Sequence, residues 1–407
     1  MAVVKPFAAL RPQPELAARV CAPPYDVMTE SEARRMAADE SLSFIHVSRP
    51  EVQLPTGSSA SSPAAYAAAR SAFERMIDSG ALRRDPAPGF YLYRQATRDH
   101  TQTGFVALAS CEEYVRGRIL KHELTRVEKE EDRVRHIECL SAQTGPAFLF
   151  HQPDATLAEL ARRATERAPE IDFEAADGVR HSAWSVTDAA VNGAIEQAFA
   201  RLPRLYIADG HHRSAAAARV WERRPDDPAA AGFLAVIFPS DTLRILPYHR
   251  VVRDLNGRSS GEFQEQLGGV CARLPGDSPT PARKGMFALF MDGAWTQWQF
   301  RADPPDTGGA ADTLDVAMLQ RRVLEPLLGI ENPRTSDRID FVGGIRGTGA
   351  LESLVQEAGY ACAFAMFPTR IDELMAVADA GGVMPPKSTW FEPKLRDAMF
   401  IHRLGES

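Results

Sequence analysis

The chain has 407 residues, 44% of them hydrophobic and 25% charged, which is typical of a globular protein with two or three domains. Its formal net charge of -7 excludes a protein whose main task is to hold nucleic acid on a basic surface. No run of about 18 apolar residues predicts a membrane span, and the N-terminus has no signal pattern, so we expect a cytoplasmic protein. The five scattered cysteines form no CxxC pair, which favours reduced thiols over disulfides or a zinc site.

Helices dominate the predictions for the first 80 residues. Thr29, followed three residues later by Glu32, indicates a capping box at the start of a helix that continues to about Asp39. The run 43–47 predicts a short strand, and the alanine-rich run 64–79 predicts a helix.

A hairpin and a charged helix are expected next. The β-like runs 90–93 and 103–108, joined by a polar link, predict two paired strands. A charged stretch that begins at Lys121 then continues into a helix with opposite charges three or four residues apart. The exposed face of that helix is predicted to carry Lys129, Glu130, Asp132 and Arg133.

The clearest pattern lies between residues 204 and 238. A strand over 204–208 is followed by an Asp-Gly turn, a helix over 214–223 and a buried strand over 233–238, so the segment predicts a strand–helix–strand unit. Farther along the chain, the patterns predict a helix over 314–328, a strand over 361–367 and a helix over 371–380.

The turn of that unit, at residues 209–214, can bind an anion. Free N–H groups and the dipole of a helix start attract negative charge, and the Arg213 guanidinium suits phosphate oxygens. His212 can donate to the same phosphates, while Asp209 can hold a magnesium ion or direct a proton. The predicted cofactor-binding residues of this turn are Gly210, His211, His212, Arg213 and Ser214. The alternative is an Asp-Gly turn that caps a helix, with two histidines in solvent.

A second candidate is Lys121-His122-Glu123-Leu124-Thr125. Glu123 can act as a general base toward a hydroxyl, and Thr125 and Arg126 can contact a phosphate. The alternative is a solvated run of charges.

Two stiff, proline-rich segments complete the candidates. The loop around Lys387, Ser388 and Thr389 offers cationic and hydroxyl groups to a substrate carboxylate or phosphate, although its aromatic neighbours could simply dock the C-terminus. Tyr25 and Asp26, after two prolines, can line a substrate site or form a structural turn.

The motifs PPYD, KHE-T, DGHHR, LPYHRVV, LGI and MPPKSTWFEPK, spread from Pro23 to Lys394, resemble the prokaryotic family known as domain of unknown function 1015. The central box also resembles the nucleotide-binding box of the ParB/sulfiredoxin-like fold and of free serine kinases, whose Asp-Gly-His-His-Arg is the text of residues 209–213. The cysteine of the sulfiredoxin box is absent, and sulfinic-acid reduction needs a thiol there. The stretch between His122-Glu123 and the central box is longer than in the small serine kinases.

The resemblance implies a mixed α/β protein in three parts. These are an N-terminal α/β region over 1–88, a ParB/sulfiredoxin-like nucleotide-binding core over 89–255, and a C-terminal α/β region over 256–407 that contributes a loop to the site. It also implies a kinase that uses ATP or ADP with Mg²⁺ and phosphorylates a small hydroxyl-bearing metabolite such as free L-serine. Glu123, Asp209 and His212 would be catalytic, with Glu123 as the base and Asp209 as the metal ligand.

Two other functions stay open: a ParB-like nucleotide switch and a non-catalytic nucleotide-binding regulator. A switch of the first kind needs a basic helix-turn-helix region, which the sequence does not show, and the acidic balance also counts against it. Turnover distinguishes the kinase from the regulator. We expect neither nucleic acid nor a membrane as a partner, and the sequence leaves open whether the protein is a homodimer.

Overall fold

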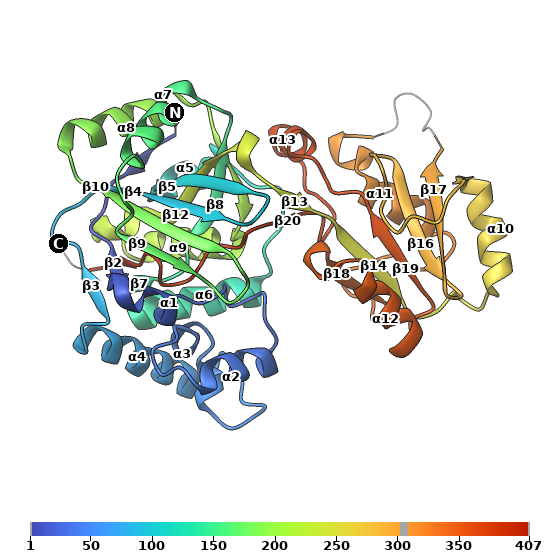
Figure 1. The fold of residues 1–407 in the computed structure, drawn as a ribbon, viewed down its shortest axis with the longest axis horizontal. Helices are drawn as coiled ribbons and strands as arrows, with labels where there is room; N and C mark the ends of the chain where they lie inside the picture. The colour runs from blue at the N-terminus through green and yellow to red at the C-terminus, as the bar shows by residue number, and fades with distance from the viewer. Residues whose placement is uncertain (1, 302–307, 406–407) are drawn as a thin grey trace. The chain divides into compact units, whose positions relative to one another are not determined.

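The computed structural model describes residues 2–301 and 308–405. The chain divides into two compact units, one formed by Met1–Leu243 with Pro393–Ser407 and the other by Arg244–Glu392. The second unit is therefore inserted into the first, and the C-terminal segment returns to the first unit (Figure 1). This division differs from the borders expected after residues 88 and 255.

The first unit is built on a mixed sheet. Within the described residues, nine strands belong to it. Eight of them form the path β6 (Ile119–Leu120), β11 (Leu205–Asp209), β8 (Ala147–His151), β12 (Gly232–Pro239), β5 (Thr101–Ser110), β4 (Phe90–Ala96), β10 (Arg180–Val186) and β9 (Ile171–Glu174). The remaining strand, β1 (Val4–Lys5), pairs antiparallel with β5. The predicted hairpin is confirmed as β4 and β5.

Two neighbouring strands of this sheet end at the same edge. β6 and β11 run parallel, with Leu205 opposite Ile119 and Tyr206 opposite Leu120. Their carboxyl ends therefore lead side by side into the segment 121–126 and the turn at Asp209. Ligands of α/β sheets bind at such carboxyl ends.

One face of the sheet packs against helices because each helix presents an apolar stripe to it. The core there includes Ala216 and Val220 of α9, Ile195 of α8 and Leu157 of α7, together with Ile237 of β12. The helices of the first unit are α1 (Ala17–Val20), α2 (Glu30–Ala38), α3 (Ile45–Ser48), α4 (Pro63–Asp78), α5 (Cys111–Val115), α6 (Val127–Leu140), α7 (Ala155–Ala164), α8 (Ala189–Arg201) and α9 (His211–Arg223).

The helices near the N-terminus agree with two of the predictions from the sequence and contradict a third. Thr29 caps α2 and forms the expected capping box with Glu32. The helix predicted over 64–79 is confirmed as α4. The strand predicted over 43–47 is wrong, because these residues lead into the short helix α3, where Phe44, Ile45 and Val47 are buried in a helical cluster. The run is apolar enough for a strand, but burial among helices decided its conformation.

The C-terminal segment, dark red in Figure 1, crosses the other face of the sheet. Phe400 contacts Tyr91 and Tyr93, with ring centroids 5.2 and 5.9 Å apart. Beyond it, β21 (His402–Arg403) pairs with β7 (Ala142–Gln143). The segment is thus an integral part of the first unit. A further small pair joins β2 (Leu10–Pro12) to β3 (Leu82–Arg84).

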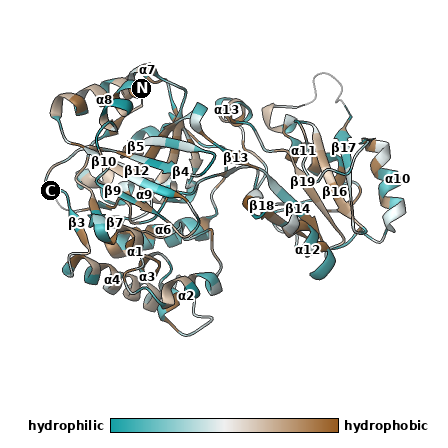
Figure 2. Ribbon diagram, in the orientation of Figure 1, coloured by the Kyte–Doolittle hydropathy of each residue, from teal (hydrophilic) through white to brown (hydrophobic). Residues whose placement is uncertain are grey.

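The second unit has its own sheet, in the order β15 (Cys271–Leu274), β17 (Ala294–Phe300), β16 (Met286–Met291), β19 (Cys362–Met366), β14 (Tyr248–Val252) and β18 (Ile339–Gly343). Figure 2 shows the hydrophobic character of the central strands β16 and β19. Its helices are α10 (Ser260–Val270), α11 (Asp315–Leu319), α12 (Gly349–Glu357) and α13 (Ile371–Asp379), and a small pair joins β13 (Ile245–Leu246) to β20 (Trp390–Phe391). The helix predicted over 314–328 is α only over Asp315–Leu319 and continues as a π-helix over Gln320–Leu324.

The mixed α/β class predicted from the sequence is confirmed. Among the described residues, no helix has both the length and the apolar character needed to cross a bilayer.

Candidate functional site

The predicted turn lies where β11 passes into α9. Gly210 has φ 89° and is the N-cap of α9, so the helix begins without a side-chain cap. A Cβ here would lie 3.1 Å from Arg213 Nε and 3.2 Å from the Ala147 Cα, and the backbone conformation favours glycine as well. The N–H groups of the first turn of α9 therefore have no capping oxygen, which suits an anion.

Asp209, the last residue of β11, is held by two donors. Its Oδ1 accepts from the Gly210 N–H at 2.7 Å, and its Oδ2 accepts from Lys394 Nζ at 2.9 Å. Burial alone would raise the pKa of Asp209, but the charges of Lys394 and Arg213 outweigh it and hold this pKa well below its ordinary value. Asp209 is therefore an anion whose negative charge is matched by two cations.

The predicted magnesium site at Asp209 does not fit this arrangement. Both carboxylate oxygens already accept hydrogen bonds, one of them from the Lys394 ammonium. Within the described ranges, no three Asp, Glu, His or Cys side chains converge as metal ligands. The positive charge at this carboxylate comes from Lys394 and Arg213.

Arg213 points inward, behind the turn. Its Nη1 donates to the Pro146 carbonyl at 2.5 Å, and its Nη2 lies 3.9 Å from Asp209 Oδ2. Its Nε is buried and has no hydrogen-bond partner among the described residues. Burial lowers the pKa of Arg213, but Asp209, Asp26 and Asp397 raise it above its usual value, so the guanidinium stays charged.

A cavity of about 30 Å³ lies beside this guanidinium. Its polar lining comes from five parts of the first unit: Tyr25 and Ser48 near the N-terminus, Arg133 and His136 on α6, Gln143 and Thr144 between α6 and β8, Arg213 on α9, and Asp397 in the C-terminal segment. The exposed face predicted for α6 is wrong at three of its four positions, since the side chain of Glu130 is only 17% exposed and bonds to Arg219. The side chains of Arg133 and Asp132 are only 12% and 21% exposed, because Arg133 bonds to Asp132 and lies over the Tyr25 ring, 4.0 Å from its centroid.

The segment before α6 meets the turn through histidines. The rings of His122 and His211 pack edge to face with centroids 4.5 Å apart. Burial lowers the pKa of His122 to about 4, and burial together with His122 lowers the pKa of His211 well below its usual value. Both rings are therefore neutral at neutral pH. They fix the two loops against each other and cannot act as cations.

His212 faces the other way from this pair. Its Nε2 accepts from the Arg126 N–H at 3.1 Å, so the proton of the neutral ring lies on Nδ1. Burial and then Lys129 lower the pKa of His212. The predicted neighbours of this histidine have structural partners: the Thr125 hydroxyl donates to Glu130 at 2.8 Å, and the buried Ser214 hydroxyl donates to the Gly210 carbonyl at 3.2 Å. Glu123 is half-buried and directly follows His122.

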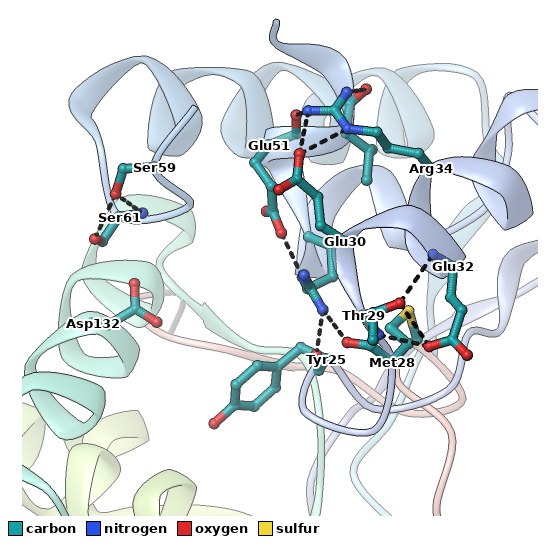
Figure 3. Close-up of polar contacts among 12 residues, drawn as sticks. Tyr25, Met28, Thr29, Glu30, Glu32, Arg34, Glu51, Ser59, Ser61 and Asp132 are labelled. Atoms are coloured by element: carbon teal, nitrogen blue, oxygen red, sulfur yellow. Dashed lines mark hydrogen bonds and ion pairs between the residues drawn. The ribbon is translucent and has the colours of Figure 1, made fainter. Parts of the chain in front are cut away.

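Tyr25 and Asp26 line a second, larger pocket of about 430 Å³. Figure 3 shows Tyr25, Glu51 and Asp132 in this region, together with Ser59 and Ser61. The pocket shares Tyr25, Ser48, Arg133 and His136 with the small cavity. The two predicted substrate residues of the N-terminus therefore belong to the same unit as the central turn, and Tyr25 reaches the cavity beside Arg213.

The other predicted substrate residues lie in the second unit. The Ser388 hydroxyl is buried and donates to the Pro385 carbonyl at 2.7 Å, while its own carbonyl accepts from Thr369. Lys387 is exposed, with its ammonium 5.4 Å from the centre of the Tyr248 ring, and Thr389 is half-buried. Their substrate role stays a prediction.

Three residues of the site escaped prediction from the sequence: Lys394, Asp397 and Gly145. Lys394 belongs to the quoted C-terminal motif, and this was the signal available for it. The structure shows why position 145 holds a glycine, because a Cβ there would lie 2.3 Å from Asp397 Oδ1.

The family model described as "Protein of unknown function (DUF1015)" matches residues 4–317. The chain belongs to the DUF1015 family. The family predicted from the motifs is thus confirmed, and the match covers the central turn and the segment 121–126 of this DUF1015 protein. No curated protein matches the chain.

Solved structures similar to this DUF1015 protein share little sequence with it. A free serine kinase in complex with AMP is 13% identical, covers 67% of this chain and 83% of its own, and has a TM-score of 0.34. A conserved hypothetical protein from Pyrococcus furiosus is 12% identical over 69% of this chain and 90% of its own, with a TM-score of 0.35. A C-terminally truncated SbnI from Staphylococcus aureus is 11% identical over 72% and 85%, with a TM-score of 0.39.

Proposed function

We propose that this protein is a nucleotide-dependent phosphotransferase that acts on the hydroxyl group of a small molecule, with free L-serine as the first acceptor to test. The observation that carries the proposal is the uncapped start of α9 at Gly210, where the positive φ and the tight space around a Cβ favour glycine. Phosphates of ATP or ADP fit this position, because they need N–H donors and a close approach of the backbone. The bound nucleotide would supply the phosphoryl group that is transferred.

The residues around the turn match the needs of this reaction. Phosphoryl transfer depends mainly on positioning and on the neutralisation of charge. The N–H groups of the first turn and the proton on His212 Nδ1 are donors for phosphate oxygens. Lys394, now on Asp209, can share its ammonium with a neighbouring phosphate, since an ammonium has three protons to donate.

Glu123 is the proposed general base. It is half-buried at the carboxyl edge shared by β6 and β11, and the His122–His211 contact fixes its segment to the turn. A carboxylate at this edge can accept the proton of an acceptor hydroxyl while the new O–P bond forms.

A nucleotide-and-acceptor screen tests the proposal. ATP and ADP are incubated with hydroxyl-bearing metabolites, L-serine among them, and phosphorylated products are measured, while nucleotide affinity is measured by calorimetry. We expect transfer by the wild type and a loss of about 100-fold or more in Glu123→Gln, with nucleotide affinity unchanged. Glu112→Gln, on the exposed face of α5, is the matched control and should keep full activity.

The outcomes distinguish the kinase from the regulator and test the nucleotide site itself. Binding and transfer support the kinase, and full activity in Glu123→Gln contradicts the assignment of the base. Nucleotide binding without transfer to any acceptor indicates the regulator. If neither ATP nor ADP binds, the nucleotide site at Gly210 is wrong.

A further inference from the structure

The small cavity beside Arg213 brings together more hydrogen-bond donors than its own residues use. Arg213 Nε and Ser48 Oγ are both buried and lack a partner among the described residues. Arg133 uses Nε and Nη2 for Asp132. Ser48 is 3% exposed. A group that accepts several hydrogen bonds would satisfy these donors, and oxyanions are such groups.

The size of the cavity matches the end of an oxyanion. A volume of about 30 Å³ holds roughly two water-sized atoms. That is the space of the two leading oxygens of a carboxylate or a phosphoryl group. The adjoining pocket of about 430 Å³ shares Tyr25, Ser48, Arg133 and His136 with the cavity, so it can hold the rest of a small molecule.

Asp397 lines the same cavity, but an ionised carboxylate there disfavours a second anion. It is 3% exposed, its backbone is fixed by a bond from its N–H to the Ala22 carbonyl at 2.8 Å, and its Oδ1 lies against Gly145. As a carboxylate it is itself an anion beside Arg213 and Arg133, so it competes with any second anion for these guanidiniums. An oxyanion and an ionised Asp397 would repel each other in a dry cavity.

We propose that this cavity binds an oxyanion between Arg133 and Arg213, and that Asp397 must be protonated when it does. The ligand class is a small molecule with a carboxylate or a phosphoryl group at one end. This inference goes beyond the proposed function. It concerns an anionic group other than the nucleotide phosphates, and its test measures binding alone.

The surroundings of Asp397 are compatible with a protonated carboxyl group at neutral pH. Burial raises the pKa of Asp397 to about 7, and Asp26 acts in the same direction, while the guanidiniums lower it. The charged or titratable groups that face it are Arg213, Arg133, Arg396, Asp26, Tyr25 and Cys21. Burial holds the pKa of His136, the histidine of the cavity, at about 4, so this histidine does not titrate near pH 7.

Calorimetric titration with sulfate and with acetate tests the proposal. Sulfate represents a phosphoryl group and acetate a carboxylate, and neither changes charge between pH 6 and 8. We expect the binding constant of the wild type to fall about tenfold per pH unit above pH 7, because one proton is taken up with the anion. Asp397→Asn mimics the protonated acid, so it should bind about tenfold more tightly than the wild type at pH 8, without pH dependence. Exposed Asp226, changed to Asn, is the control and should behave as the wild type does.

A second variant, Arg133→Gln, tests whether the anion binds in this cavity. It should lose anion binding, although the start of α9 is intact. Binding of sulfate alone assigns a phosphoryl group, and binding of acetate alone assigns a carboxylate. The proposal is overturned if neither anion binds at pH 6, if Asp397→Asn keeps the wild-type pH slope, or if Arg133→Gln binds normally. Failure of the nucleotide screen would leave these results unchanged, so the two proposals can fail separately.

Discussion

Lys394 Nζ lies 2.9 Å from Asp209 Oδ2, although 185 positions separate the two residues in the sequence. The strand that ends at Asp209 belongs to the central motif, whereas Lys394 follows the whole inserted unit. The pair therefore joins the central turn to the C-terminal segment, and Asp397 lies three residues farther along that segment. The central turn and the C-terminal segment, which are far apart in the sequence, therefore form one site.

Replacement of Lys394 by Met should destabilise the first unit by about 2 kcal/mol, because Asp209 stays mostly buried and loses its nearest cation. Urea unfolding measures the change. The lowered pKa of Asp209 means that its contribution is present above the unfolded pKa of about 4 and is lost as pH falls below it. The cost of Lys394→Met should accordingly shrink in acid. Lys5→Met, which removes a surface ion pair, is the control and should have little effect.

Gly145→Ala should destabilise the protein by about 1–3 kcal/mol, because the new methyl group would collide with the Asp397 carboxylate. The matched change Gly193→Ala, in the middle of α8 with open space around the new Cβ, should instead stabilise by about 0.5–1 kcal/mol. Comparison of the two unfolding midpoints checks both expectations. Equal effects would show that Gly145 is not in contact with Asp397.

His122 should remain neutral down to about pH 5, and His211 should also be neutral at neutral pH. Burial holds the pKa of His122 near 4 and that of His211 well below its usual value. NMR of the imidazole nitrogens during a pH titration measures this directly. Because the unfolded chain takes up these protons near pH 6.5, stability should fall as pH drops from 6.5 toward 4. A titration midpoint near 6.5 for either ring would contradict the buried contact.

Asp397→Asn should change how stability depends on pH. In the wild type the pKa of Asp397 is raised to about 7, so its favourable contribution is complete below about pH 4 and is lost as pH rises through 7. The variant cannot ionise there. The difference in unfolding free energy between the two proteins should therefore shift in favour of the variant from pH 4 to pH 8. A constant difference over this range would show that Asp397 ionises normally.

The local parts of the fold were predictable where one element carries its own signal. Thr29 with Glu32 predicts α2 because the capping box is a contact within one turn. The Asp-Gly turn before α9 was recognisable because glycine permits the backbone conformation that Gly210 adopts. The helix itself begins at His211, three residues before the predicted start, because apolar periodicity appears only after Ser214.

The parts that depend on distant partners were not predictable. Arg133 looks like an exposed charge on α6, and only the approach of the distant Tyr25 ring explains its burial. The run 43–47 has the composition of a strand, but its neighbours in space are helices. The contact between Lys394 and Asp209 follows from the insertion of the second unit, for which no local pattern in the sequence is evident.

The return of residues 393–405 to the first unit also constrains how the chain folds during its synthesis. During synthesis on the ribosome, the strands of the first unit emerge before the inserted unit, but the partners of Tyr91, Asp209 and Gly145 in the C-terminal segment emerge after it. A chain without this segment therefore holds the sheet with one apolar face uncovered and with the half-buried Asp209 lacking its lysine. Folding of the first unit must wait until residues 393–405 have been synthesised, and a nascent chain arrested within the inserted unit should be open to proteolysis in both units.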